Sequence, residues 1–452
     1  MRILFLLAAL LPKMAAAQEA EQTNHRYDED WSGLSAAPRE GWREAKYIPL
    51  TIDGAAYLTL GGEARARFEG FDDNLWGDPP APDDGYLWLR VMPHADLHAG
   101  PARVFVQGIA GYARGVGAGK GPVDETGIDL LQGFADIRVP LGGHGSLTVR
   151  GGRELVALGS ERLIGVRYGP NIPQPLDGVR AVVDRGPIRI DAFHLRPVTV
   201  GGGDLDDRAS KTRRLDGVYA TIAPATDTGI DAYWLGYKNE EARFADRTGR
   251  ETRHTFGVRF FGKRGDLGWN WEAMLQRGHF DGDRIRAWSL ATETAWSFPQ
   301  APLKPRFRLR ANIASGDHDP ADRRLGTFNA LFPKGKYFGE LSPVGPRNIV
   351  NFHPSVDFDL GKGVTVELVA ARFWRESRGD GVYDIPGGLI RPSGGSDARH
   401  IGDQVEISAG WQANALLSFN ASLSAFRPGP YIRDTGPART IHMVGAEAML
   451  KL

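Results

Sequence analysis

Arginine residues recur at every second position in parts of the chain where polar and apolar side chains alternate. Within residues 306–312, apolar side chains separate three of them, which are Arg306, Arg308 and Arg310. Successive side chains of a β-strand point to opposite faces, so this spacing places the three guanidinium groups together on one face. A guanidinium group stays charged and binds carboxylates through two parallel hydrogen bonds. The pattern therefore predicts a surface that attracts anionic solutes.

The same alternation puts further arginines on the polar faces of other segments, namely Arg65, Arg67, Arg90, Arg150, Arg180, Arg253 and Arg259, with Arg375 beside another such segment. Carboxylates share these faces, including Glu63, Glu69, Asp136, Glu272, Asp357, Glu367 and Glu406. Two interpretations stay open. The arginines can form a track of weak sites for an anionic solute, or they can pair with the carboxylates and brace the fold.

A loop rich in glycine and proline carries an acidic group, which consists of Asp317, Asp319 and Asp322. Carboxylate oxygens are the ligands that Ca²⁺ prefers, but the spacing lacks the distal glutamate of a calcium loop. We keep these residues as a candidate metal site beside the simpler interpretation of a solvated loop. No nucleophile elbow surrounds Ser160, no histidines have zinc-ligand spacing, and the chain contains no cysteine. We therefore expect neither an enzyme nor a bound cofactor.

The elements that must position these side chains are strands. Residues 57–69 alternate apolar or small with polar side chains over six cycles, and residues 306–312 and 417–425 repeat the pattern. We count about eighteen such segments of roughly 9–13 residues, the length that a tilted strand needs to cross an outer membrane. The predicted fold is all-β: a single large antiparallel transmembrane β-barrel of about 18 strands, of the bacterial outer-membrane type.

The connections between the segments alternate in length. Short turns such as residues 99–101 and 361–363 alternate with long polar loops, which are residues 72–85, 115–126, 154–175, 198–211, 315–346 and 376–399. Short turns on one rim and long loops on the other are typical of outer-membrane barrels. Periodicity alone does not separate a barrel from a soluble β-sandwich, whose apolar faces pack on each other. The loop asymmetry and the strand length favour the barrel.

The N-terminus predicts export. Arg2, a short apolar stretch and three alanines before Gln18 form a signal peptide over residues 1–17. We expect residues 18–56 to form a periplasmic lead-in segment and residues 57–452 to form the barrel. The formal net charge is zero, with 55 basic and 55 acidic side chains, which excludes a nucleic-acid binder that acts through bulk basicity.

Several long motifs occur in a fixed order: GRELVALGSERL at residues 152–163, GPNIPQPLDGVR at 169–180, SGDHDPADRRLGTFNALFPKGKYFGE at 315–340, GPRNIVNFHP at 345–354, FWRESRGDGVYDIPGGLIR at 373–391 and RHIGDQVEI at 399–407. With them the chain resembles the alginate export family from about residue 57 to its end. The resemblance implies an eighteen-stranded outer-membrane barrel with an electropositive pore for an anionic uronate polysaccharide. It also implies pore arginines at the motif positions Arg153, Arg162, Arg180, Arg347 and Arg375.

These observations together predict an outer-membrane channel that passes an anionic polysaccharide or oligosaccharide, such as alginate-like uronates, through an arginine-rich pore. A porin for other small anionic or sugar solutes is the alternative, and a barrel enzyme acting on polysaccharide or lipid is a more distant one. The expected partners are the saccharide, outer-membrane lipid and periplasmic secretion components, with no nucleic acid. We expect a monomer in the outer membrane of a Gram-negative bacterium.

Overall fold

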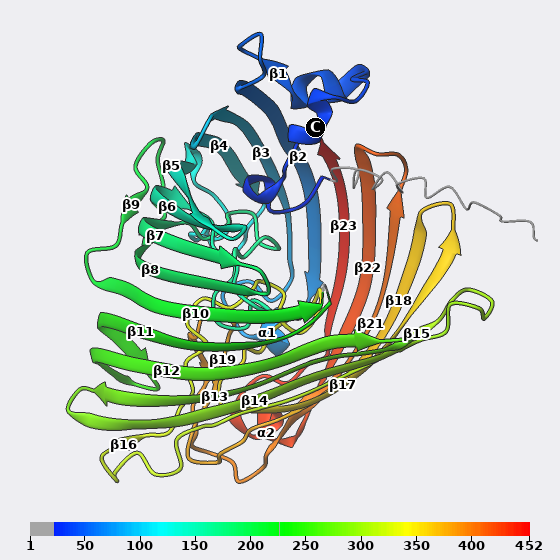
Figure 1. The fold of residues 1–452 in the computed structure, drawn as a ribbon. Helices are drawn as coiled ribbons and strands as arrows, with labels where there is room; N and C mark the ends of the chain where they lie inside the picture. Colours follow the sequence, from blue (N-terminus) through cyan, green and yellow to red (C-terminus); the bar gives the residue numbers. More distant parts are fainter. Residues whose placement is uncertain (1–21, 226) are drawn as a thin grey trace, which may run out of the picture.

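Strands with alternating polar and apolar side chains form a closed antiparallel barrel in the computed structural model (Figure 1). The structure describes residues 22–225 and 227–452. The signal peptide expected at residues 1–17 lies outside the described residues. Within the described chain, the 18 barrel strands are β2 (Ala56–Asp72), β3 (Asp84–Ala99), β4 (Ala102–Arg114), β5 (Gly127–Gly142), β6 (Gly145–Glu154), β7 (Leu176–Arg185), β8 (Ile188–Thr199), β10 (Arg213–Ala225), β11 (Thr228–Phe244), β12 (Arg247–Arg264), β13 (Leu267–Phe280), β14 (Asp283–Ser297), β15 (Arg306–Ala314), β17 (Ile349–Gly361), β18 (Val364–Trp374), β21 (His400–Gln412), β22 (Leu417–Pro428) and β23 (Ile441–Lys451).

Each barrel strand pairs antiparallel with its neighbour, and the last strand pairs with the first. β23 runs beside β2 with Ala64 opposite Leu450, as the adjacent red and blue strands show (Figure 1). Closure leaves no strand edge unpaired, which a lipid environment requires because it offers no hydrogen bonds. The predicted all-β barrel of about 18 strands is confirmed.

The remaining elements are short. They are β1 (Ile48–Pro49), β9 (Arg208–Ala209), β16 (Arg324–Leu325), β19 (Val382–Tyr383), β20 (Leu389–Arg391), α1 (Asn74–Gly77), α2 (Pro430–Thr435), and the 3-10 turns η1 (Arg26–Asp28), η2 (Ser32–Ser35) and η3 (Gly41–Lys46). In the described part of the chain, no helix is long and apolar enough to cross a membrane.

The alternation in each strand separates an outer apolar face from an inner polar face. In β2, Phe68 is 42% exposed on the outside, whereas Arg65 and Arg67 are buried on the inside. An apolar side chain that is exposed in this way faces lipid, and the charged set faces the lumen. The pattern predicted for residues 57–69 is therefore the one observed.

All of the long connections leave from one rim of the barrel, which we call the loop rim, and short turns occupy the opposite turn rim. Two connections at the loop rim are nevertheless short, at residues 245–246 and 281–282. The connection at residues 245–246 joins the two long strands β11, with 17 residues, and β12, with 18. Extra strand length takes the place of a loop there, which the sequence pattern did not predict.

Two of the long loops turn into the barrel and pack on each other. We call residues 155–175 the first inner loop and residues 315–348 the second inner loop. The amide of Phe332 donates to the carbonyl of Leu163 at 2.9 Å, and the amide of Gly165 donates to the carbonyl of Phe332 at 2.8 Å. Apolar side chains of both loops join one buried cluster, so the barrel has a packed core in part of its interior.

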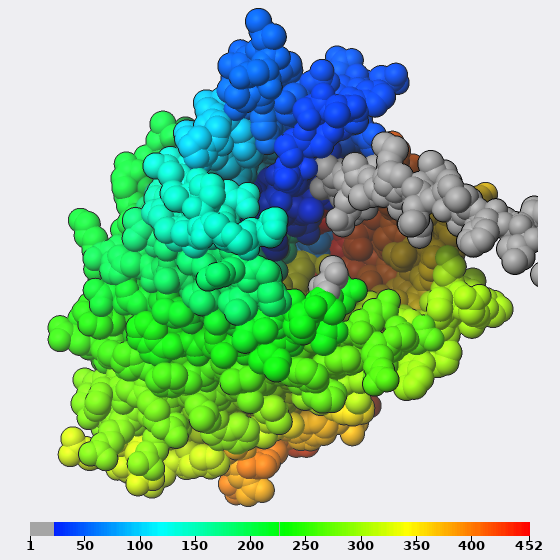
Figure 2. All heavy atoms as spheres, in the orientation of Figure 1, coloured from blue at the N-terminus to red at the C-terminus, as the bar shows by residue number. Residues whose placement is uncertain are grey.

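The N-terminal segment, residues 22–55, covers part of the turn rim (Figures 1 and 2). Tyr27 is buried with residues of β4 and of the first inner loop, and Arg103 donates to its carbonyl at 2.7 Å. Beside this segment the space-filling view shows a hollow in the molecule (Figure 2). The lumen therefore opens at the turn rim next to the N-terminal segment.

Candidate functional site: the barrel lumen

Two predicted pore arginines hold the first inner loop against the wall. Arg65 of β2 donates to the carbonyl of Pro170 at 2.7 Å, and Arg90 of β3 donates to the same carbonyl at 3.1 Å. Arg90 also forms an ion pair with Glu63 at 2.7 Å, and Glu63 accepts the hydroxyl of Tyr168. Both arginines are nearly inaccessible. Their guanidinium groups are used for bracing, because both Nη atoms of each already donate to backbone carbonyls or a carboxylate, and only Nε of each has no partner.

The second inner loop is anchored in the same manner. Arg253 of β12 forms an ion pair with Glu251 at 2.5 Å and donates to the carbonyl of Thr327 at 3.2 Å. Arg347, which lies in this loop, donates to the side chain of Asn329 at 2.8 Å. Charged side chains therefore fix both inner loops to the strands around them.

Three more predicted arginines form buried ion pairs inside the lumen. Arg67 pairs with Glu69 at 2.6 Å and with Glu447 at 2.9 Å, Arg150 with Asp136 at 2.7 Å, and Arg180 with Asp191 at 2.5 Å. Arg150 and Arg180 also share Glu154, at 3.1 Å each. Arg162 of the first inner loop pairs with Glu272 at 2.9 Å. Fully paired charges of this kind offer little to a passing solute.

Arg153 and Arg375 correct the expectation that every predicted arginine faces the pore. Arg153 lies on the outward set of β6, where Val149 is 48% exposed, and pairs with Asp177 at 2.7 Å. Arg375 is fully buried in the loop after β18, where it donates to the carbonyl of Ala398 at 2.6 Å. Both residues hold a connection in place at a strand end, which alternation along a strand does not predict.

Four predicted arginines make at most one side-chain hydrogen bond to the described residues: Arg259, Arg306, Arg308 and Arg310. Arg306 has no hydrogen-bond or ion-pair partner among the described residues. Arg259 is buried 3.1 Å from Asp231, yet its Nε and Nη1 make no hydrogen bond. Arg308 pairs with Asp357 at 2.5 Å, but its Nε has no partner. Arg310 lies 3.5 Å from Glu293 without a hydrogen bond from Nε. Arg259 lies on β12, and Arg306, Arg308 and Arg310 lie on β15. We call these four residues the unsaturated arginine wall.

Residues that the sequence did not single out complete this part of the wall. Lys263, Asn270 and Phe261 line a hollow of about 510 Å³ together with Arg259 and Arg306. The second inner loop adds Lys334, whose pKa is lowered by burial and by the nearby charge of Arg310. Lys334 belongs to the motif FPKGKY, but only the inward path of its loop brings it to the lumen.

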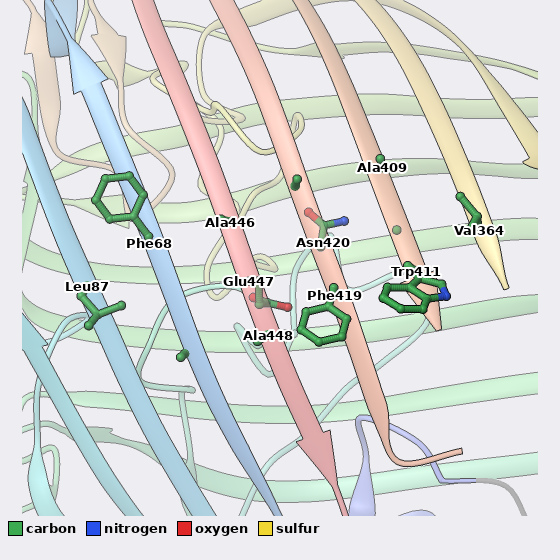
Figure 3. Close-up of a pocket in the computed structure, with 13 residues that line it drawn as sticks. Phe68, Leu87, Val364, Ala409, Trp411, Phe419, Asn420, Ala446, Glu447 and Ala448 are labelled. Carbon is green, nitrogen blue, oxygen red and sulfur yellow. The ribbon is translucent and has the colours of Figure 1, made fainter. Parts of the chain in front are cut away.

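Two further hollows, of about 490 and 390 Å³, lie near the turn rim between the N-terminal segment and the wall. Arg138 lines the first of them without a partner among the described residues. Another hollow, of about 530 Å³, lies on the outer face, where Ala409, Ala446 and Ala448 leave space between Phe68 and Trp411 (Figure 3). It is apolar and faces lipid, so it is separate from the lumen.

The candidate metal site does not form. Within the described chain, the carboxylates of Asp317, Asp319 and Asp322 are not among the acidic groups that come close enough to share an ion. Asp319 accepts the amide of Ala321, and Asp322 accepts the amide of Arg324, both within turns. Short acidic side chains commonly stabilise turns in this way.

Asp317 makes the contact between the second inner loop and the loop after β18 dependent on pH. Burial and the charge of Asp380 raise the pKa of Asp317 to about 6. Because this value exceeds the ordinary pKa of about 4, the contact is strongest below pH 4 and weakens as pH rises through 6. We expect amide hydrogen exchange in residues 316–327, corrected for intrinsic rates, to be faster at pH 8 than at pH 5. D317N should remove this difference, and a difference that persists would contradict the assignment.

The comparisons with known proteins agree with this architecture. The sequence model of the alginate export family matches residues 56–446. The fold is similar to that of OccK2 (OpdF) of Pseudomonas aeruginosa, at 12% identity and a TM-score of 0.59, over 87% of this chain and 97% of that chain. It is also similar to OccAB1 of Acinetobacter baumannii, at 12% identity and a TM-score of 0.57, over 90% of this chain and 99% of that chain. No curated protein matches the sequence significantly.

The family match covers most of the chain, and the similar structures are outer-membrane proteins with the same closed barrel. The protein is accordingly an outer-membrane channel. The chain belongs to the alginate export family.

Proposed function

We propose that the channel passes anionic saccharides of the uronate type, and that the unsaturated arginine wall supplies the weak sites along which they move. The observation that carries this proposal is the unused hydrogen-bonding capacity of Arg259 and Arg306, beside the partly satisfied Arg308 and Arg310. A carboxylate on each sugar unit can accept from such groups in turn. Conduction needs many sites of moderate strength, because one tight site would hold the solute.

The similar structures support the class of solute. OccK2 (OpdF) of P. aeruginosa was also crystallised in complex with glucuronate, a uronate monomer. That ligand carries the same chemical group, a carboxylate on a sugar ring, as the solute proposed for this chain.

A second candidate is a porin for short uronate oligomers or other small anions instead of a polymer. The two inner loops favour it, because Arg65, Arg90 and Arg253 fix them inside the barrel and they fill part of the lumen. A polymer chain needs a continuous path past them. The passive channel itself has no direction, so the solute gradient or periplasmic machinery sets export or uptake.

Recording in planar bilayers distinguishes these candidates. We expect the reversal potential in a KCl gradient to show anion preference, and uronate oligomers to block the current reversibly. Neutral oligosaccharides of the same length should block at least tenfold more weakly, since one charge-assisted hydrogen bond contributes about 1.5–3 kcal/mol. If block is confined to monomers and dimers, the channel takes small solutes. A current without anion preference would contradict both candidates.

We also propose that the protein acts without catalysis. Purified protein incubated with uronate oligomers should leave their chain-length distribution unchanged. Shortened chains would show that the barrel is an enzyme, and a single loop substitution that stops the shortening would locate its site.

A further inference from the structure

A group of basic side chains lies on the outside of the barrel, just below the loop rim. It consists of Lys238 on β11, Arg277 and His279 on β13, Arg284 and Arg286 on β14, and Arg324 on β16, and we call these six residues the outer basic patch. All six side chains are exposed. They occupy the outward positions of their strands, because Leu275, two residues from Arg277, is 53% exposed on the same face.

The strand register brings five of these six basic residues beside one another. Arg277 pairs with Arg286 across β13 and β14, and His279 pairs with Arg284. Arg284 in turn lies beside Arg324 on the short parallel strand β16. Neighbouring strands are about 4.8 Å apart, and like charges directly opposite each other destabilise a sheet. An anion that compensates these charges would therefore stabilise this part of the sheet.

The described residues, 22–225 and 227–452, do not supply that anion. Among the described residues, none of the six forms an ion pair, and the side chain of Arg277 donates only to the backbone carbonyl of Gln276. Other cations already use the nearby carboxylates. Asp216 pairs with Arg214 at 3.1 Å, Glu240 with Arg250 at 2.5 Å, and Asp283 with Arg247 at 2.7 Å. An anion bound at the patch would therefore come from outside the described part of the chain.

The height of the patch in the membrane indicates which anion this is. Leu275, Trp288 and Leu290 lie below it on β13 and β14, and Phe256 lies on the neighbouring strand β12; all four are exposed to lipid. The loops lie above it, on the side that faces the cell exterior in barrels of this class. The patch thus occupies the boundary between hydrocarbon and water in the outer leaflet, where lipid phosphates lie. Arginine and lysine reach such groups with extended side chains, and arginine binds phosphate bidentately.

We propose that the outer basic patch binds the phosphate groups of the phosphorylated glycolipid of the outer leaflet, lipid A. Arg277, Arg284 and Arg286 supply the charge, and Trp288 packs against the lipid below them. The lipid compensates the opposed cations and holds β13 and β14 in the membrane at a set depth. This site faces lipid and is separate from the lumen through which the solute passes.

Native mass spectrometry of the full protein in mild detergent tests the proposal with three probes. We expect lipid A to stay bound, and enzymatically dephosphorylated lipid A to bind about 10- to 100-fold more weakly, as the loss of several cation contacts implies. Phosphatidylglycerol and inorganic phosphate should also bind at least tenfold more weakly than lipid A. Equal retention of dephosphorylated lipid A would overturn the proposal, and so would inorganic phosphate that binds as tightly as lipid A.

Variants test the residues. R277Q/R284Q/R286Q should weaken lipid A binding about 10- to 100-fold, whereas R277K/R284K/R286K should retain most of it. The matched control is R372Q, on the outward face of β18, because Arg372 is already paired with Asp403 at 2.5 Å. Unchanged binding by the glutamine variant, or equal loss in R372Q, would overturn the assignment. The comparison of lipids uses the unaltered protein. It therefore tests whether the patch binds lipid A even if a variant fails to insert into the membrane.

Discussion

Replacing Arg90 with methionine is expected to release the first inner loop and to raise the conductance of the channel. Arg90 is almost completely buried, pairs with Glu63 and holds the carbonyls of Pro170 and Asn171. Removing one partner of a buried ion pair leaves an uncompensated charge, which costs about 3–5 kcal/mol. This cost in free energy is larger than the stabilisation that a single contact between loop and wall provides. The loop should therefore leave the wall, while the barrel strands stay paired.

Two measurements follow the loop. Single-channel records of R90M should show a larger and noisier current, and trypsin should cleave at Arg162 or Arg167, which the native fold protects by burial and pairing. R138M is the matched control, since Arg138 lies at the turn rim without a described partner. E63Q/R90M removes both charges and should restore part of the native behaviour. Native conductance and protease resistance in R90M would show that Arg90 does not hold the loop.

Replacing Arg306, Arg308 and Arg310 with glutamine is expected to convert anion preference into cation preference. Arg308 lies beside Asp357 and Glu367, Arg310 lies beside Glu293, and Arg306 is opposite Asp357 in the strand register. Removing three positive charges leaves these carboxylates with fewer cationic partners, so the local charge of the wall becomes more negative. The charges that line a pore determine which ions it passes. Block by uronate oligomers should weaken by an order of magnitude or more.

The reversal potential in a KCl gradient measures this change. The control is R308Q/D357N, which removes one positive and one negative charge and so leaves the local net charge unchanged. Its reversal potential should remain close to that of the native channel. If R306Q/R308Q/R310Q also keeps the native reversal potential and the native oligomer block, the arginines only brace the strands. In that case the solute must follow another part of the lumen.

The alternation of side chains was sufficient to predict the barrel. Residues 57–69 show why, because every second side chain must face lipid and the others must face the lumen, and a shift by one residue would reverse the two faces. The sequence also predicted that Arg306, Arg308 and Arg310 share one face, since that follows from strand geometry alone. The inner loops could not be predicted, because a loop contains no periodic pattern from which its path can be read.

The sequence by itself determined the antiparallel barrel, the two faces of its wall and the family. Only the tertiary structure decided which arginines are already satisfied. Arg90 and Arg306 look alike in the sequence, yet the first inner loop brings carbonyls to Arg90, whereas no residue that the structure describes forms a hydrogen bond or ion pair with the side chain of Arg306. Arg277 and Arg286 are likewise brought side by side only by the register of β13 and β14. The physical reason is that alternation is a local property of one strand, whereas a partner for a charge arrives from distant parts of the chain.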